Sequence, residues 1–204
     1  MGATVKLQRV VKRFPRRDGG STTVLDSVDL ICRAGESLIV RGRSGTGKST
    51  LLNLIAGLYK PDEGRVKVGE LELQTLGESE RDRFRAERVG YVFQTFNLLS
   101  PLSALENLHV PAALAGRERA SSRAEARAVL VDLGLEEHLD KRPYELSVGQ
   151  RQRVAVGRAL LHRPDVLLAD EPTANLDGEA AAQVLGAMSE LCEEGTTLII
   201  ATHD

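Results

Sequence analysis

Residues 42–49 read GRSGTGKS, which is the composition and spacing of a phosphate-binding loop. The apolar run 37–41 before it predicts a buried strand, and residues 49–58 after it predict a helix, so the motif stands in the strand–loop–helix order that it requires. The three glycines let successive N–H groups approach a triphosphate at the positive end of the helix. The stretch therefore predicts a nucleotide site, whereas a glycine-rich turn that binds nothing would not need this context.

The polar side chains of this loop suit a triphosphate with its metal ion. Lys48 adds a full charge aimed at the β and γ phosphates, and the hydroxyl of Ser49 is the expected Mg²⁺ ligand. The residues expected to surround the nucleotide here are Gly42, Arg43, Ser44, Gly45, Thr46, Gly47, Lys48, Ser49 and Thr50.

A second stretch, VLLADE at 166–171, brings two carboxylates to the end of a strand. Its four apolar residues predict a buried strand, and ligands of α/β sheets bind at the carboxyl ends of strands. We expect Asp170 to hold the Mg²⁺ shell and Glu171 to orient or deprotonate an attacking water. Without the phosphate loop, the same pair would read as an exposed acidic turn.

The charge balance gives no reason to expect a nucleic-acid partner. The chain has 204 residues with 27 Lys+Arg against 29 Asp+Glu, so no net field attracts nucleic acid or anionic lipid. No run reaches the roughly eighteen apolar residues of a spanning helix, the start is too charged for a signal peptide, and Lys6 argues against myristoylation. Any membrane link is therefore expected to come through another subunit.

The two cysteines, Cys32 and Cys192, are far apart and lack a CxxC spacing. We expect each to be packed in the protein rather than paired or metal-bound, which suits a reducing cytosol.

The pattern along the chain predicts two lobes. Segments 5–12, 24–32 and 65–68 are rich in β-formers around turns and predict a small antiparallel layer, while 103–133 has helical spacing and predicts a helical lobe. Strand character returns at 166–170 and 196–202. An amphipathic helix is expected between them, ending at Gly195, with its apolar positions at Val184, Leu185, Met188, Leu191 and Cys192.

Further short motifs follow the phosphate loop in a fixed order. They are Gln94 within YVFQTFNLL, LSVGQ at 146–150 opening the helix RQRVAVGRALL, ANLD at 174–177 and His203 after an apolar strand. With these motifs the chain resembles the ATP-binding-cassette (ABC) ATPases over essentially its whole length. One glutamine or one histidine by itself would mean little, and the remaining histidines, His109, His138 and His162, fall outside the motifs.

The resemblance implies that two copies pair head to tail and sandwich two ATP molecules. In the family, the LSGGQ-type segment of one copy grips the γ-phosphate held by the other, which assigns nucleotide contacts to Ser147, Gly149 and Gln150. Asp177 belongs to the segment that crosses this interface, and Phe14 takes the place of the aromatic residue that stacks on adenine.

The family also implies the catalytic and metal-binding set. The catalytic residues would be Glu171, His203, Lys48 and Gln94, and the metal ligands Ser49, Gln94 and Asp170, with ATP and Mg²⁺ as cofactors. Three positions depart from the usual pattern: Val148 replaces a glycine, Arg43 a proline and Phe14 the commoner tyrosine.

The implied fold is an α/β P-loop NTPase with a mixed central sheet, a small antiparallel β layer and a helical lobe. We expect one ABC ATPase domain over 1–204, with its core at about 1–94 and 156–204 and the helical lobe at about 95–155. The family normally continues beyond position 204, so the C-terminal end of the usual domain is expected to be missing. A strand without its neighbour would then make the chain marginally stable.

The segments FQTFNLLSPLSALENL and DEPTANLD are most similar to the subgroup that drives lipoprotein release, macrolide export and cell-division complexes. The expected partners are a second ATPase subunit and integral membrane permease subunits. The expected location is cytoplasmic, at the inner face of the membrane through the permease. The sequence does not indicate the transported substrate or the direction of transport.

Other classes of protein explain the motifs less completely. The main alternative is a soluble ABC ATPase acting on DNA, which would need a long coiled-coil insertion that the interval between phosphate loop and LSVGQ is too short to hold. An ABC translation factor would carry two cassettes. A P-loop kinase or small GTPase would not explain LSVGQ, ANLD and His203 together, and a catalytically dead adaptor would not need Lys48 and Glu171.

Overall fold

The computed structural model describes residues 2–114, 119–174 and 176–203. The described strands form two four-stranded sheets, one antiparallel with the order β2-β1-β4-β5 and one parallel with the order β3-β8-β7-β6. The strands are β1 (Val5–Pro15), β2 (Ser21–Cys32), β3 (Ser37–Arg41), β4 (Glu63–Val68), β5 (Leu71–Glu72), β6 (Val89–Val92), β7 (Val166–Asp170) and β8 (Thr197–Thr202).

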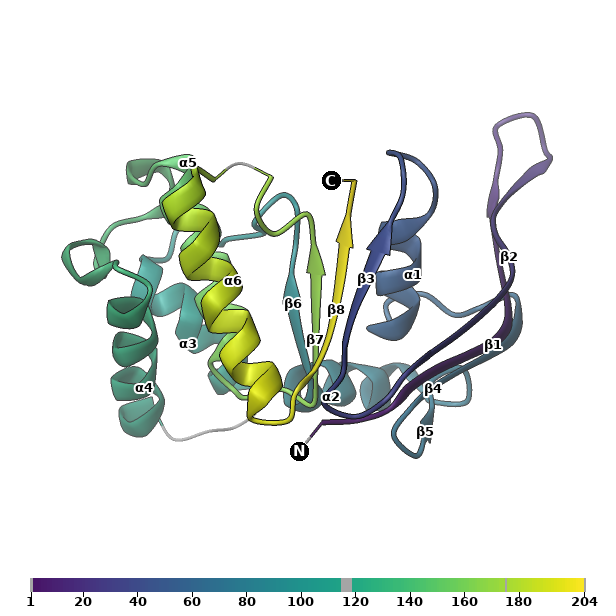
Figure 1. The fold of residues 1–204 in the computed structure, drawn as a ribbon, viewed down its shortest axis with the longest axis horizontal. Helices are drawn as coiled ribbons and strands as arrows, with labels where there is room; N and C mark the ends of the chain where they lie inside the picture. Colours follow the sequence, from purple (N-terminus) through teal and green to yellow (C-terminus); the bar gives the residue numbers. More distant parts are fainter. Residues whose placement is uncertain (1, 115–118, 175, 204) are drawn as a thin grey trace.

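The helices divide between the parallel sheet and a separate lobe. They are α1 (Lys48–Ile55), α2 (Glu78–Arg88), α3 (Ala104–Leu114), α4 (Arg119–Asp132), α5 (Val148–Leu160) and α6 (Gly178–Glu193), with short 3-10 turns η1 (Glu136–His138) and η2 (Pro143–Glu145). Figure 1 shows the antiparallel sheet at one end of the molecule, the parallel sheet in the middle, and α3, α4 and the start of α5 at the other end.

Helix α1 is held between the two sheets. Its buried residues Leu52 and Ile55 belong to one apolar cluster with Val5 of β1 and Leu168 of β7. Burying such a face contributes most of the stability of a short helix, because an isolated helix of this length is not stable in water. This packing fixes the position of the loop that enters α1.

Helix α5 connects the helical lobe to the parallel sheet. Its Val154 belongs to the core of the lobe, whereas Val156 and Ala159 belong to the cluster under β7 and α6. The start of the helix is held by a capping box, in which the Ser147 hydroxyl accepts a hydrogen bond from the Gln150 backbone N–H.

The register of the parallel sheet brings the ends of its strands to one level. Ala201 of β8 lies opposite Val40 of β3 on one side and opposite Asp170 of β7 on the other. Since all four strands run in the same direction, the residues that follow them emerge at one edge of the sheet. This edge is the place where the fold can assemble a ligand site.

The fold class is confirmed: a central sheet covered by helices, an antiparallel layer and a helical lobe are all present. The central sheet, which was predicted to be mixed, is parallel in the four strands that the structure describes. Two further details differ from the sequence prediction. The helix predicted at 49–58 ends at Ile55, because Gly57 takes a left-handed φ of 68°. Leu185, predicted on the apolar face of α6, is 41% exposed, since it lies one residue around the helix from the buried Val184.

Some predictions lie outside the described residues or are not decided by the fold. Residues 115–118 of the predicted helical lobe and Asn175 of the ANLD segment are outside the described ranges. The division into a core and a lobe with a boundary at 155 stays a prediction. Helix α2 was not predicted at all.

Strand β3 is the last strand in the order of the parallel sheet, and its Ile39 is 55% exposed.

Cys32 is buried and free, and burial, with a smaller effect of Glu36, raises the pKa of its thiol to about 11. Cys192 is partly buried and also free.

Within the described ranges, none of the helices has the length and apolar character needed to cross a bilayer.

Candidate functional site

A cleft of about 620 Å³ opens at the edge of the parallel sheet where the strands end. It is lined by Val24, Arg43, Ser44, Gly45, Gly47, Lys48, Ser49, Thr50, Gln94, Asp170, Glu171 and His203. Apart from Val24, every one of these residues was predicted to belong to the site. They come from the segments that follow β3, β6, β7 and β8, together with β2.

The phosphate loop has a conformation that depends on its glycines. Gly47 caps α1 with φ 93°, and a Cβ there would lie 3.0 Å from side-chain atoms of Val24 and Leu25. Both the backbone angle and the available space therefore require glycine at this position. Val24 covers the loop from β2, and strand alternation alone gave no signal that it would face this particular loop.

Lys48 points back over its own loop. Its Nζ donates hydrogen bonds to the carbonyl oxygens of Gly42 at 2.6 Å and Arg43 at 3.2 Å, and lies 3.9 Å from Glu171 Oε1. Its side chain is only 9% exposed, so these interactions act with little screening by water. The ammonium group is thus already partly dehydrated and surrounded by oxygen atoms, as phosphate oxygens would surround it.

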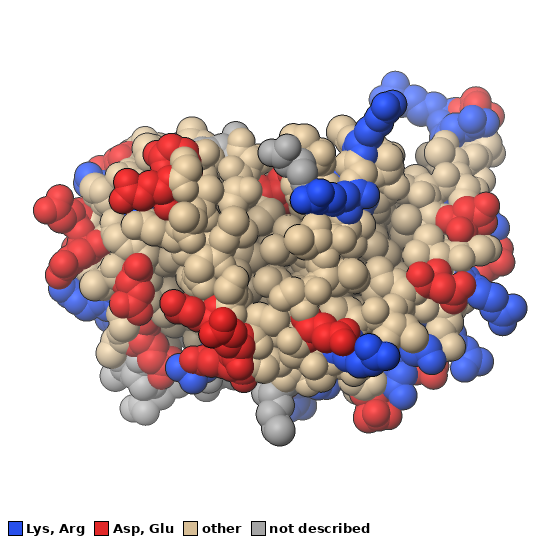
Figure 2. All heavy atoms as spheres, viewed as in Figure 1, with Lys and Arg blue, Asp and Glu red and all other residues tan. Residues whose placement is uncertain are grey.

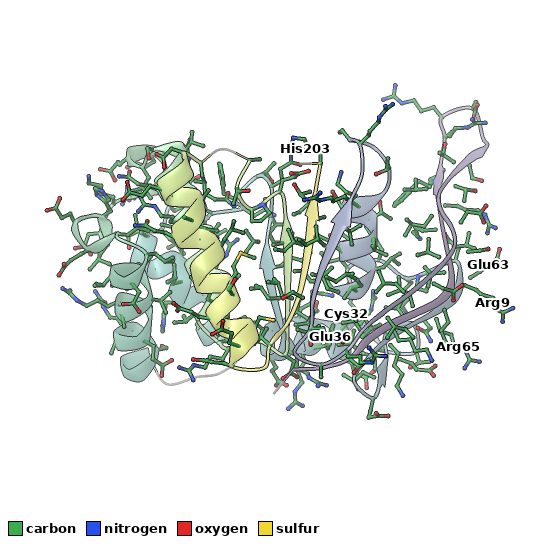
Figure 3. The ribbon with its side chains drawn as sticks, viewed as in Figure 1. Arg9, Cys32, Glu36, Glu63, Arg65 and His203 are labelled. Carbon is green, nitrogen blue, oxygen red and sulfur yellow. The ribbon has the colours of Figure 1, made fainter. Side chains whose placement is uncertain are left out.

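Glu171 is held in position by the end of β8. Its Oε2 lies 2.8 Å from Nδ1 of His203 and accepts a hydrogen bond from the Thr202 hydroxyl at 3.2 Å, and its backbone N–H bonds to Ala201 O at 2.9 Å. Figure 3 shows His203 just beyond the end of β8. The side chain of Glu171 is 8% exposed, whereas that of His203 is 59% exposed. The carboxylate is therefore buried, while its histidine partner faces solvent.

The backbone of Glu171 lies in the left-handed region, with φ 49°. This conformation costs a non-glycine residue roughly 1–3 kcal/mol, and such strain persists only where the surroundings impose it. Here it turns the chain sharply after β7, so that the carboxylate lies between Lys48 and His203.

The predicted metal ligands Ser49, Gln94 and Asp170 line the same cleft. They supply a hydroxyl, an amide oxygen and a carboxylate, which are the hard oxygen ligands that Mg²⁺ prefers, and Mg²⁺ needs few protein ligands because it keeps waters and phosphate oxygens. The residues present therefore fit a magnesium ion accompanying a triphosphate.

Tyr91 of β6 is a partly buried phenol close enough to Asp170 to be affected by its charge. Burial first, and then the charge of Asp170, raise the pKa of Tyr91, so the phenol stays protonated at neutral pH. Its hydroxyl donates a hydrogen bond to Asn53 Oδ1 of α1 at 3.0 Å. This contact ties the strand before Gln94 to the helix after the phosphate loop.

The segment after Gln94 is attached to α5. Phe96 and Asn97 have left-handed backbones, with φ 62° and 49°, and the guanidinium of Arg158 donates hydrogen bonds to the carbonyl oxygens of both residues. Burial lowers the pKa of the Arg158 guanidinium below its ordinary value.

Several predicted nucleotide contacts do not line the cleft. Gly42 and Thr46 belong to the loop but are not among the residues that line the cavity, and Phe14 packs edge-on against Tyr59 with ring centroids 5.5 Å apart. The others are at helix starts: Ser147, Gly149 and Gln150 at α5, and Asp177, which caps α6 by accepting from Ala180 N at 2.8 Å. Their roles stay predictions.

The two helix starts are neighbours in the folded chain. A Cβ at Gly149 would lie 3.4 Å from a side-chain carbon of Leu176, in the ANLD segment. Ser147 and Asp177 are both exposed, and Val148 is 41% exposed. The two motifs therefore form one surface on the chain, separate from the cleft.

Comparison with known proteins identifies the family of this chain. The family model described as "ABC transporter" matches residues 25–174. The lipoprotein-releasing system ATP-binding protein LolD of Idiomarina loihiensis is 45% identical over 92% of this chain and 83% of its own length. The ABC transporter ATP-binding protein YbbA of Escherichia coli K12 is 46% identical over 89% of this chain and 80% of its own length.

A third relative is much longer than this chain. The macrolide export ATP-binding/permease protein MacB of Burkholderia thailandensis is 44% identical over 98% of this chain, which spans only 30% of MacB.

Solved structures agree with these relatives. A dimeric post-hydrolysis state of the ATP-binding cassette MJ0796, bound to ADP and Pi, superposes with a TM-score of 0.93 at 36% identity, covering 98% of this chain and 88% of that one. A second dimeric structure of MJ0796 gives a TM-score of 0.90. This chain therefore belongs to the ABC transporter family, as an ATP-binding and ATP-hydrolysing cassette.

Proposed function

We propose that this chain binds ATP with Mg²⁺ in its cleft and hydrolyses it only when a second copy closes over that cleft. The observation that carries the proposal is the separation of two sets of motif residues. Lys48, Glu171 and His203 meet in one cleft, whereas the capped start of α5 lies outside it and faces solvent. Each copy would thus supply half of two composite sites.

The phosphate half of the site would hold the triphosphate by its loop and by Lys48. Amides at the start of α1 and the Lys48 ammonium would bind the β and γ phosphates. Ser49, Asp170 and Gln94 would hold Mg²⁺, which when bound would neutralise phosphate charge.

Glu171 would act as the base. Its carboxylate would take a proton from a water molecule as the water oxygen attacks the γ-phosphorus in line, and the bond to the β–γ bridging oxygen would break to release ADP. Lys48 and His203 hold the two carboxylate oxygens from opposite sides, which orients the base before the substrate arrives. His203 would also contact the γ-phosphate.

The start of α5 would complete the site of the other copy. Its unpaired backbone N–H groups and the Ser147 hydroxyl form a natural anion cradle. ATP would favour the closed pair because only there do its phosphates contact both copies, and hydrolysis would remove that attraction. The dimeric structures of the similar cassette MJ0796 support this arrangement.

A groove between the lobes would receive the permease. It has a volume of about 770 Å³ and is lined by residues of α2, by Tyr91 and Phe93, and by Arg158 and His162 of the α5 region. Phe93 directly precedes Gln94, and Arg158 holds the loop after it. A permease segment seated here would therefore contact the chain beside its metal site, from the cytoplasmic face of the membrane.

The similarity to LolD, a lipoprotein-releasing protein, and to MacB, a macrolide export protein, supports a place in the subgroup that contains both. We infer that this chain powers a permease of that type through ATP-driven dimerisation. The alternative of a soluble ABC ATPase acting on DNA is not favoured by the relatives found.

The split site is tested with the substitution Glu171→Gln. This variant should bind ATP with the affinity of the parent. Its rate of ATP hydrolysis should fall at least about a hundredfold, because a general base contributes roughly 10²–10⁴-fold to the rate. It should accumulate as an ATP-dependent dimer, which gel filtration with light scattering detects. Glu190→Gln, an exposed position on α6, is the matched control and should behave as the parent. Monomers with normal turnover in the Glu171→Gln sample would contradict the role of Glu171.

The transport role is tested by reconstitution. ATPase activity should rise in proteoliposomes that contain the copurified native permease, and should not respond to double-stranded DNA. Stimulation by DNA without response to the permease would instead support the DNA-acting alternative.

A further inference from the structure

His138 contacts the signature segment although it belongs to none of the sequence motifs. It ends the 3-10 turn η1, and its Nε2 lies 2.7 Å from Nε2 of Gln150, the last residue of LSVGQ. The same Gln150 forms the capping box of α5, with its Oε1 accepting from Ser147 N at 2.9 Å and its backbone N–H bonding to Ser147 Oγ at 3.2 Å. A single side chain thus links His138 to the start of the helix.

The capping box determines which atom donates in the His138 contact. Because Gln150 Oε1 accepts from the Ser147 N–H, the amide group facing His138 is the NH₂, which can only donate. The Nε2 of His138 must then be the acceptor, and the ring is neutral with its proton on Nδ1.

The other ring nitrogen makes this contact unusual. Nδ1 of His138 is buried and has no hydrogen-bond partner among the residues that the structure describes. A buried polar atom without a partner lowers stability, so an apolar side chain of similar size would suit the monomer at least as well. The contact with Gln150 therefore contributes more to the position of the signature segment than to the stability of the monomer.

We propose that His138 is a positioning residue for the signature half of the ATP site. By accepting from Gln150, it holds the amide so that Oε1 stays on Ser147 N, which keeps the first turn of α5 and the Ser147 hydroxyl in one geometry. The inference rests on the proposed split site, since the start of α5 matters for ATP only when a second copy is present.

The test uses ATP-dependent dimerisation in the Glu171→Gln background, with His138→Met added. Loss of one hydrogen bond should weaken each of two equivalent signature sites about threefold, and dimerisation about tenfold overall. ATP affinity of the monomer should stay within about twofold of the parent, and the melting temperature without nucleotide should be equal or higher, because the buried Nδ1 is gone.

Two further variants separate positioning from simple packing. His138→Gln restores an acceptor oxygen at similar reach and should recover most of the dimerisation. His109→Met breaks another histidine contact in the same lobe, the one between His109 Nδ1 and Ser122 Oγ at 2.9 Å, and should leave dimerisation unchanged.

The proposal is overturned if His138→Met dimerises like the parent, if His138→Gln is as weak as His138→Met, if His109→Met is equally weak, or if weaker dimerisation comes with a lower melting temperature. If the Glu171→Gln parent itself stays monomeric with ATP, the split site fails rather than this assignment.

Discussion

The cleft and the signature surface are built in opposite ways. In the cleft, the ends of the parallel strands bring Lys48, Glu171 and His203 into direct contact, and two of the three side chains are nearly buried. On the signature surface, the side chains of Ser147 and Asp177 hydrogen-bond to the first turns of their own helices and remain exposed. Figure 2 shows Asp and Glu side chains gathered over the lower end of α6, on the face that this view presents.

This contrast shows which half of the composite site has its side chains positioned before a second copy is present. The cleft already holds Glu171 against His203 at 2.8 Å and near Lys48 at 3.9 Å, so we expect it to bind a triphosphate without a second copy. On the signature surface the Ser147 hydroxyl pairs with the Gln150 backbone N–H, and a phosphate would have to come from a second copy. Substitutions in the two regions should therefore affect different steps.

The largest effect is expected from Lys48→Ala, which removes the charge of the cleft. The loop amides alone would leave much of the negative charge of the phosphates without a positive partner. ATP affinity should therefore fall by roughly two orders of magnitude or more, about 3 kcal/mol. Titration calorimetry measures this. Lys67→Ala, which removes a surface lysine paired with Glu70, is the control, and unchanged affinity in Lys48→Ala would contradict the assignment.

A smaller effect with a different pattern is expected from Ser147→Ala. Loss of the cap should cost about 1 kcal/mol of stability, measured by chemical unfolding. ATP affinity of the monomer should not change, whereas ATPase activity, which needs the paired state, should fall about tenfold or more. If monomer affinity fell as well, the two regions would not be separate.

Ser103→Ala is the control for capping itself. It removes the side-chain cap of α3, where the Ser103 hydroxyl accepts from Glu106 N at 3.2 Å, with a similar cost in stability, which shows how much of the Ser147→Ala effect comes from a frayed helix.

The smallest effect is expected from Val148→Gly. Val148 is exposed at the first position of α5, where we expect its side chain to limit the approach of a phosphate bound to a second copy. Glycine should tighten ATP-dependent dimerisation by about two- to fivefold, while helix propensity changes stability by less than about 1 kcal/mol. Weaker dimerisation in light scattering would show that Val148 adds apolar contact instead of obstructing it.

The difference between the regions also explains what the sequence could predict. The phosphate loop and the carboxylates after β7 were predictable because their chemistry is local: glycines, a lysine and a strand end lie within a few residues of one another. Val24 was missed because its place over Gly47 depends on how β2 packs against the loop. The His138–Gln150 contact was missed for the same reason, since no periodicity links η1 to α5.

Helix α2 and the exposure of Leu185 illustrate a second limit. Residues 78–88 carry one buried residue, Phe84, so their apolar pattern is too weak to indicate a helix. For Leu185, the width of the buried stripe on α6 depends on the sheet beneath it, which composition does not reveal.

Arg158 joins the segment after Gln94 to helix α5. Its guanidinium donates hydrogen bonds to the carbonyl oxygens of Phe96 and Asn97, which both have left-handed backbones. Arg158 belongs to α5, the helix whose first turn contains the signature segment. A displacement of the segment after Gln94 would have to move α5 as well or break the hydrogen bonds of a partly buried guanidinium, and the second outcome is costly. Under the proposed function, movement of a permease segment in the groove would therefore be transmitted through α5 to the residues that contact the ATP of the other copy.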